Sequence, residues 1–515
     1  MAAFFSKLLD KSKQLMDGVD LRVQLAVGSI VLAATGVWVK HINLSRRRAK
    51  EAPVLWSWIP IFGSALEFGK RPIEFMIERS KECKEIIGVL LAGQRMFIIH
   101  DPSSYQVIFK ADPKKLSFDE FAVQVKGNAF GMTKEGAEDL THDSPARALY
   151  NKYLFQDREG EGMVVAMVNK LDKMASEIPT QKTTVNFYEF VSTFAFKGSI
   201  AAIFSEDMAD IEGLYQSFAD YDSKFALSVA GMPMSLFPAA LRGREACVRA
   251  VGDALPTAKG FIEARVKLYT EAEDGLTSVV MDDIVRLQLA MMWASVSNTM
   301  PAAYWTLYFI MLDPAAKSAV LDEIGLVFGP VDANTTRVPT TTQLQALTVL
   351  DSAISEALRL MSGSLIMRQV MVDGLELTLA SGTTYKFREC DKVGIFPTIS
   401  HYDPRLFQDP TTYKFDRFLK LPESVEMNGG GRPVKVKPSA CFLPFGAGVS
   451  YCPGRKFARN EIKTIVYYLM RFFSTEFVDV EEAKKYSRSY EGSRAGLGVF
   501  PPVNAGIQVT VTPLI

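Results

Sequence analysis

A loop rich in glycine and proline surrounds a single cysteine late in the chain and leads directly into an amphipathic helical pattern. The loop and the start of the helix read FLPFGAGVSYCPGRKFARNE, from residue 442 to residue 461. Glycines permit a tight turn whose N–H groups point at a sulfur, and such donors near a helix N-terminus lower the pKa of a thiol. These surroundings suit Cys452 as the thiolate ligand of a metal or a haem iron. From composition alone, a buried and inert cysteine is the alternative.

The spacing inside this loop is more specific than its composition. Phe445, Gly448, Cys452 and Gly454 form the pattern F-x-x-G-x-x-x-C-x-G. This pattern is similar to the cysteine-loop signature of haem-thiolate monooxygenases, the cytochrome P-450 superfamily. The resemblance implies that Cys452 is the axial ligand of the iron in haem b (iron protoporphyrin IX), and that the other three residues shape the cofactor site.

A predicted helix upstream carries an acid and a base three residues apart, away from its apolar stripe. The stripe consists of Leu347, Leu350, Ile354 and Leu358. Considered alone, Glu356 and Arg359 indicate a solvated ion pair. The superfamily instead carries E-x-x-R followed by an aromatic-acid-Arg-Phe segment, which this chain has as FDRF at residues 415–418. The resemblance therefore implies a buried structural network of Glu356, Arg359 and Arg417 that braces the cysteine loop.

The longest apolar helix is predicted over about residues 283–312 and contains Pro301. Proline lacks an N–H and crowds the carbonyl four residues back, so we expect the Ser297 carbonyl to lose its helical partner and the helix to bend. By resemblance, a groove at the bend holds dioxygen and water over the haem, whereas a kinked core helix is the alternative. Superfamily members usually place an acid and then Thr here. This chain has Ser297 and Asn298, followed by Thr299, so these are the predicted catalytic residues and the acid–alcohol pair is missing.

The haem propionates need cationic partners, and the chain departs from the usual pattern here. Ser450 stands where the family often has a basic residue, and no W-x-x-x-R pattern is visible in an early helix. Arg368 matches a position that pairs with a propionate in many members, which makes it a predicted cofactor-binding residue. His142 and Arg147 are weaker candidates, and a surface charge is the alternative for each.

Two segments resemble one branch of the superfamily. Asn298 followed by T-x-P-A-x-x-W is similar to the branch of cholesterol 7α-hydroxylase, sterol 12α-hydroxylase and prostacyclin synthase, and residues 493–502, SRAGLGVFPP, resemble the first of these. The resemblance implies a monooxygenase that hydroxylates a sterol, steroid or terpenoid-like hydrophobic small molecule. Electrons would come from a separate NADPH–cytochrome P-450 reductase, because the chain has neither G-x-G-x-x-G at a strand–helix junction nor G-x-x-x-x-G-K-[ST].

Two other functions stay open. A branch relative that rearranges an endoperoxide also carries Asn in the central helix, so a reductase-independent isomerase or dehydratase of a lipid endoperoxide or hydroperoxide is the alternative enzyme. A haem protein that binds without turnover is the third. Behind the cysteine, four cations form a face that could dock an acidic reductase or be merely solvated. They are Arg455, Lys456, Arg459 and Lys463.

Composition narrows the remaining choices. The 58 basic and 58 acidic residues leave no net charge, which argues against nucleic-acid binding, and 48% hydrophobic residues require a large core. The five cysteines are scattered without a CxxC pair, which argues against disulfides or structural zinc and fits a reducing compartment. Helical periodicity dominates to about residue 360, with one strand pair at 86–91 and 95–100 and small sheets expected within 371–387 and 498–511. The predicted fold is mainly α with small β-sheets, the cytochrome P-450 fold by resemblance.

An apolar run near the N-terminus covers residues 25–39, 15 residues, or 19 when extended back to residue 21. It predicts a transmembrane helix, with a cleaved signal peptide as the alternative. Five basic residues follow it, and the positive-inside rule then places the body in the cytosol. They are Lys40, Arg46, Arg47, Arg48 and Lys50. We therefore expect a membrane anchor with a basic flank at 1–50, a single catalytic domain at 51–515, and location in the endoplasmic reticulum membrane facing the cytosol.

Overall fold

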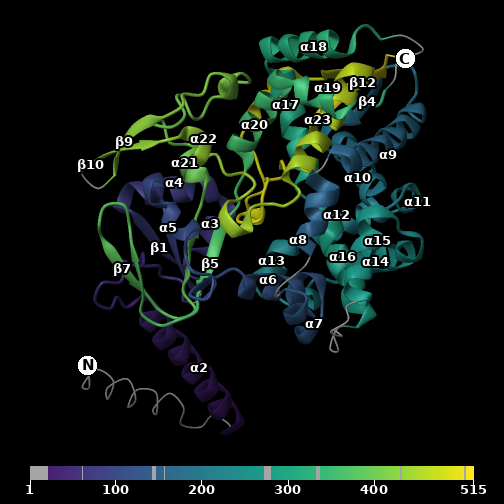
Figure 1. The fold of residues 1–515 in the computed structure, drawn as a ribbon. Helices are drawn as coiled ribbons and strands as arrows, with labels where there is room; N and C mark the ends of the chain where they lie inside the picture. Colours follow the sequence, from purple (N-terminus) through teal and green to yellow (C-terminus); the bar gives the residue numbers. More distant parts are fainter. Residues whose placement is uncertain are drawn as a thin grey trace.

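The computed structural model describes residues 21–60, 62–141, 146–155, 157–271, 280–331, 337–429, 432–503 and 506–514. Within these ranges the protein is mainly helical with four small sheets, which confirms the predicted fold class (Figure 1). The longer helices are α2 (Leu21–Ser45), α4 (Pro72–Glu82), α9 (Asp157–Ser176), α10 (Phe187–Ile203), α12 (Leu214–Asp222), α14 (Pro238–Ala254), α15 (Gly260–Thr270), α16 (Met281–Val296), α17 (Thr299–Leu312), α18 (Pro314–Phe328), α20 (Thr348–Met361) and α23 (Arg455–Phe472). The shorter helices are α3 (Ala65–Lys70), α5 (Gln106–Phe109), α6 (Asp119–Val125), α7 (Lys134–Asp139), α8 (Ala146–Tyr150), α11 (Glu206–Ala209), α13 (Phe225–Val229), α19 (Thr341–Ala346), α21 (Thr398–His401), α22 (Pro438–Cys441) and α24 (Val480–Lys485).

The largest sheet has five strands in the order β1-β2-β8-β5-β3. Its strands are β1 (Ile86–Leu91), β2 (Gln94–Ile99), β3 (Leu116–Ser117), β5 (Ile366–Val370) and β8 (Lys392–Ile395). The predicted strand pair is confirmed: β1 and β2 are antiparallel, and Ala92 and Gly93 turn between them with φ of 49° and 81°. Strand β5 lies between β8 and β3, so Arg368 lies within the sheet.

Strands form in both segments where small sheets were expected, 371–387 and 498–511. Of the three smaller sheets, two are hairpins, one of β6 (Leu375–Thr378) with β7 (Thr384–Phe387) and one of β9 (Val425–Gly429) with β10 (Arg432–Val436). The third has the order β11-β12-β4 and consists of β11 (Phe473–Phe477), β12 (Gln508–Pro513) and β4 (Thr183–Asn186). The hairpin of β9 with β10 and the pairing with β4 were not predicted. Because β12 pairs with β4, the end of the chain lies beside the start of α10 (Figure 1).

Helix α17 lies in the interior because it is apolar on every side. Its residues 299–310 are all buried, and it packs against α10, α20 and α23. The prediction of one bent helix over about 283–312 is wrong in one respect, since the chain forms two helices, α16 and α17, with Ser297 and Asn298 between them. The break falls there because Pro301 has no N–H to donate to the Ser297 carbonyl.

Helix α2 extends away from the body, near the largest sheet (Figure 1). In the described part of the chain, no helix is both long and apolar enough to cross a membrane, so the predicted transmembrane span is not supported. The apolar run of 15 residues is preceded by Gln24 and ended by Lys40, and it measures about 22 Å as a helix against a hydrocarbon core of about 30 Å.

Candidate functional site

The cysteine loop turns sharply before it enters α23. Gly446 and Gly448 have φ of 76° and 63°, a left-handed conformation that residues with a Cβ rarely adopt. The loop closes where the Cys452 N–H donates to the Phe445 carbonyl at 2.9 Å. A Cβ on Gly448 would lie 3.4 Å from the Phe109 Cα, an ordinary van der Waals contact, so the positive φ rather than lack of space favours glycine here. The local sequence therefore determines that the sulfur is presented just before α23 begins.

The pKa of the Cys452 thiol is raised, contrary to the expectation from the loop sequence, although two neighbouring groups favour its charged form. Burial raises the pKa of this thiol, whereas a hydrogen bond from the Gly454 backbone and the charge of Arg455 oppose that shift. Cys247 and Cys441 are buried without such groups, and burial raises the pKa of each to about 12. Of these three thiols, Cys452 is best placed to serve as a thiolate ligand.

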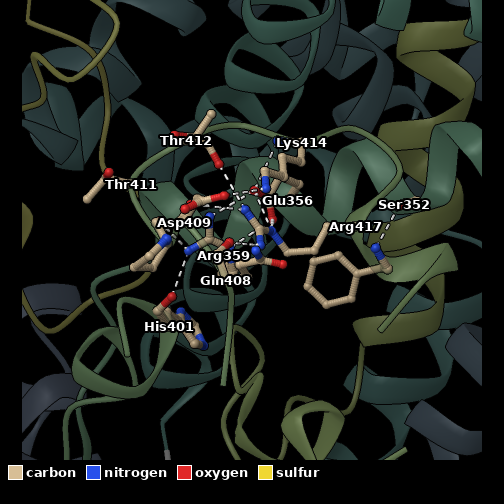
Figure 2. A network of polar contacts seen from close by, with 12 residues as sticks. Ser352, Glu356, Arg359, His401, Gln408, Asp409, Thr411, Thr412, Lys414 and Arg417 are labelled. Atoms are coloured by element: carbon tan, nitrogen blue, oxygen red, sulfur yellow. Dashed lines mark hydrogen bonds and ion pairs between the residues drawn. The ribbon is translucent and has the colours of Figure 1, made fainter. Parts of the chain in front are cut away.

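Glu356 forms ion pairs with two arginines, Arg359 and Arg417, in the interior of the protein, as Figure 2 shows. Arg359 donates to the Glu356 carboxylate from Nε and Nη2, at 2.8 Å each, and Arg417 Nε donates to both oxygens at 2.9 Å. The Lys414 N–H adds a further bond at 3.1 Å. The exposed fractions of the Glu356, Arg359 and Arg417 side chains are 0%, 0% and 6%. The structure therefore brings the three predicted network residues together, and a solvated pair is excluded.

A histidine connects this network to the cysteine loop. Arg359 Nη1 donates to the His401 carbonyl at 2.6 Å, and His401 Nε2 accepts from the Leu443 N–H at 3.1 Å. Burial, with the nearby Arg359 charge, lowers the pKa of His401 to about 3, so the ring is neutral and its Nε2 accepts. Leu443 begins the stretch that leads to Cys452. No motif in the sequence indicated a role for His401, because an isolated histidine carries no spacing signal.

Asn298, in the break between α16 and α17, is held by the C-terminal segment. Its Oδ1 accepts from the Val499 N–H at 2.9 Å. Gly498 has φ of 141°, and a Cβ there would lie 2.0 Å from the same oxygen, so glycine is required beside the amide. Because Oδ1 accepts from the backbone, the amide donor of Asn298 is its Nδ2, which carries two hydrogens.

The other two predicted catalytic residues have different surroundings. The Thr299 Oγ1 lies 2.8 Å from the Ser295 carbonyl and 2.9 Å from Oε2 of Glu461, on α23. The Ser297 hydroxyl is buried and has no hydrogen-bond partner among the residues that the structure describes. The break between α16 and α17 is therefore hydrogen-bonded to α23 through Thr299 and to the C-terminal segment through Asn298.

The cations behind the cysteine do not all face outward. Arg459 and Lys463 both pair with Asp351, at 2.9 and 3.0 Å, and Lys463 is buried. The guanidinium of Arg455 lies 4.0 Å from the centre of the Tyr451 ring. The predicted reductase-docking face therefore loses two of its four cations to ion pairs within the protein.

Comparison with known proteins assigns the family. The family described as "Cytochrome P450" matches residues 53–267 and 254–493. The chain belongs to this family. It is a cytochrome P-450 monooxygenase, and membership implies a haem iron cofactor, a hydrophobic substrate and a redox partner.

Curated relatives match over nearly their full length. "Cytochrome P450 7B1" of Mus musculus is 30% identical over 479 residues, 88% of this chain and 91% of the relative. "Cholesterol 7-alpha-monooxygenase" of Cricetulus griseus is 28% identical over 505 residues, 94% of this chain and 98% of the relative. "5-beta-cholestane-3-alpha,7-alpha-diol 12-alpha-hydroxylase" of Sus scrofa is 28% identical over 473 residues, 88% and 92% respectively. These relatives fall in the sterol-hydroxylase branch that the motifs indicate.

The surroundings of Arg368 show whether the residues of this cytochrome P-450 can hold a haem. The Arg368 side chain is buried in β5, where its Nη1 donates to the Met367 carbonyl at 2.8 Å. Its Nη2 has no partner in the described part of the chain, and burial lowers the pKa of the guanidinium. A buried, incompletely paired guanidinium is stabilised by an anion, and a haem propionate is such an anion. Together with the Cys452 loop, Arg368 therefore fits the cofactor.

The other predicted propionate partners are less informative. Arg147 Nη2 donates to the Val449 carbonyl at 3.4 Å, so it contacts the cysteine loop through the backbone. His142 lies outside the described residues. Arg368 is therefore the cation that the structure supports for this role.

A buried ion pair that the sequence did not indicate joins α12, α16 and the C-terminal segment. Arg494 forms an ion pair with Asp222, and Trp293 Nε1 donates to the other Asp222 oxygen at 2.7 Å. The Arg494 Nε and Nη2 are buried without a partner among the described residues. Because Arg494 and Asp222 are 272 positions apart, no local pattern could have paired them.

Proposed function

We propose that the protein hydroxylates a sterol, steroid or terpenoid-like substrate. The observation that carries this proposal is the match, over nearly the whole chain, to relatives named for the oxidation of cholesterol and of a cholestane diol. The contact between Asn298 and Val499 supports it, because the segment that resembles the sterol hydroxylase then bonds a predicted catalytic residue.

Haem b, when bound, would supply the chemistry that inserts one atom of dioxygen into a C–H bond of the substrate to give C–O–H. The second oxygen atom takes up two electrons and two protons and leaves as water. Cys452 holds the iron, and the loop N–H donors temper the charge on the sulfur. Arg368 pairs with a propionate. Asn298 Nδ2 donates a hydrogen bond to the substrate side of the site or holds a water there.

The electrons come from NADPH–cytochrome P-450 reductase in this proposal. The sequence has no nicotinamide or P-loop fingerprint, so a separate protein must oxidise NADPH. We place the protein at the endoplasmic reticulum membrane with its catalytic domain facing the cytosol. Exposed apolar side chains near the N-terminus support membrane contact: Ile30, Leu32 and Trp58 are 67%, 75% and 80% exposed.

A second candidate is an isomerase or dehydratase of a lipid endoperoxide or hydroperoxide. Asn298 favours it, because the amide that replaces the usual Thr can orient a peroxide bond without delivering protons. This reaction needs neither dioxygen nor a reductase.

One experiment separates the two candidates. Purified haem-loaded protein is incubated with a sterol panel, with and without NADPH and reductase, and with lipid peroxides in the absence of reductase. We expect a hydroxylated sterol that forms only when NADPH and reductase are both present. Turnover of peroxides without reductase, together with no NADPH-dependent sterol product, would refute the proposal.

A further inference from the structure

A buried carboxyl group lies against the break between α16 and α17. Glu461 is on α23, nine residues after Cys452, and it is 1% exposed. Its Oε2 lies 2.9 Å from Thr299 Oγ1, whereas its Oε1 has no hydrogen-bond partner among the described residues. Among the described residues, burial and two hydroxyl groups account for the shift in the pKa of this carboxyl. The groups that face it are the hydroxyls of Thr299 and of Ser199 on α10.

Counting hydrogens shows which oxygen carries the proton. Thr299 has one hydroxyl hydrogen, and its Oγ1 also lies 2.8 Å from the Ser295 carbonyl, which can only accept. The Ser199 hydroxyl hydrogen is likewise donated, to the Ala195 carbonyl at 2.7 Å. The single Thr299 hydrogen thus faces two acceptors, the Ser295 carbonyl and Glu461 Oε2, and can serve one of them at a time. A protonated Glu461 satisfies both contacts, because the carboxyl then donates to Thr299 Oγ1 while Thr299 donates to the Ser295 carbonyl, whereas a buried carboxylate would have to compete for that one hydrogen.

The electrostatic surroundings agree with this count. Burial raises the pKa of Glu461 to about 7, well above the usual range of a glutamate. The group is thus protonated below about pH 7 and can release its proton near physiological pH, which is what a proton donor requires.

We propose that Glu461 and Thr299, on different helices, form the acid–alcohol pair that the central helix lacks, and that Glu461 delivers protons through Thr299 to the helix break. This inference rests on the proposed monooxygenase function. Asn298 cannot take this role, because an amide does not ionise near neutral pH. Glu461 is a positioning and relay residue, since it acts through Thr299.

The relay moves one proton at a time. The carboxyl O–H bond of Glu461 breaks as an O–H bond forms at Thr299 Oγ1, and the Thr299 O–H bond breaks as its hydrogen passes to a water molecule in the break. Glu461 remains as a carboxylate until it takes up a proton from solvent. Two such transfers supply the two protons of the water that each hydroxylation releases, and a reduced nicotinamide supplies the two electrons through the redox partner.

The first measurement determines whether Glu461 is protonated, and it needs no turnover. Infrared difference spectra of the resting haem protein are recorded for wild type minus Glu461→Gln across neutral pH. We expect the C=O stretch of a protonated carboxyl that loses intensity as the pH rises through about 7. Thr299→Val should shift this band, and Thr299→Ser should restore it. A carboxylate band throughout the pH range would overturn the proposal.

The second measurement is the product formed per NADPH consumed. Glu461→Gln keeps the shape and the hydrogen bond but cannot release a proton, and Thr299→Val removes the relay hydroxyl. We expect both to lower this ratio at least about tenfold. Thr299→Ser should retain the ratio, as should the control Glu476→Gln, whose side chain is 61% exposed on β11. Wild-type ratios in both Glu461→Gln and Thr299→Val would overturn the proposal.

These measurements test the Glu461–Thr299 pair separately from the proposed monooxygenase function. If wild-type protein hydroxylates no sterol, the proposed function fails, while the infrared band and the pH dependence of NADPH-driven oxygen consumption still judge the pair. We expect this consumption to fall above about pH 7 in wild type and to lose that dependence in Glu461→Gln. An identical pH dependence in the two proteins would overturn the proposal. If Glu461→Gln does not retain haem, Thr299→Val decides alone.

Discussion

Removing the Glu356 carboxylate should destabilise the protein through two buried arginines. The carboxylate accepts from Arg359 and Arg417 at 2.8 and 2.9 Å, and the two guanidinium groups are 0% and 6% exposed. In Glu356→Ala both would stay buried beside each other without an anion, which costs about 3–5 kcal/mol. That is a large part of a typical stability of roughly 5–15 kcal/mol. The unfolding equilibrium should therefore shift by roughly two to four powers of ten.

The destabilisation caused by Glu356→Ala falls at the lower end of this range if backbone carbonyls still solvate the unpaired arginines. Arg359 Nη1 also donates to the His401 and Pro410 carbonyls, at 2.6 and 2.7 Å. These bonds retain part of the solvation of one guanidinium after the carboxylate is gone. A double variant with Arg359→Leu should recover part of the loss, because it removes one unpaired charge.

Urea unfolding followed by tryptophan fluorescence measures the stability, and the carbon monoxide difference spectrum measures haem content. Glu356→Ala should show an earlier midpoint and less haem. A matched control is Glu263→Ala, which breaks an exposed Glu263–Lys267 pair on α15 and should leave both readouts unchanged. A wild-type midpoint and full haem content in Glu356→Ala would refute the reasoning.

Three further predictions follow from other parts of the site. Cys452→Ser should abolish the carbon monoxide band typical of thiolate ligation while Cys441→Ser retains it, and the reverse result would show that the wrong cysteine was chosen. The pKa of His401 is about 3 in the folded protein, below its unfolded value, so the free energy of unfolding should fall by about 2 kcal/mol as the pH drops from 6.5 to about 5. Chemical unfolding of His401→Gln should not show this decrease. Asp222→Asn leaves the Arg494 guanidinium buried and uncompensated, so its thermal midpoint should drop, and an unchanged midpoint would contradict the pairing.

Local sequence determined the parts of the protein that depend on neighbouring residues. The glycines at 446 and 448 adopt positive φ and shape the cysteine loop, and Pro301 ends one helix where its missing N–H required a break. The strand pair at 86–99 followed from alternation and a short turn. In each case the deciding interaction lies within a few residues along the chain.

The network of Glu356, Arg359 and Arg417 was predicted in part from the sequence and decided in part by the tertiary structure. The spacing of Glu356 and Arg359 favoured a surface pair, and the resemblance implied burial with Arg417. The structure decides in favour of burial, because the segment around residues 408–417 folds over α20 and encloses both charges. Helical spacing alone specifies which side chains are adjacent but does not specify what covers them.

Only the tertiary structure assigned the long-range partners. Thr299 meets Glu461 across 162 positions, Asn298 meets Val499 across 201, and Arg459 and Lys463 pair with Asp351 instead of facing solvent. A hydrogen bond needs two atoms within about 3 Å, and helix packing sets that distance, whereas the sequence sets only the order of the elements. The sequence therefore determined which residues could carry the chemistry, and the packing of α17 against α23 determined which of them lie within hydrogen-bond distance.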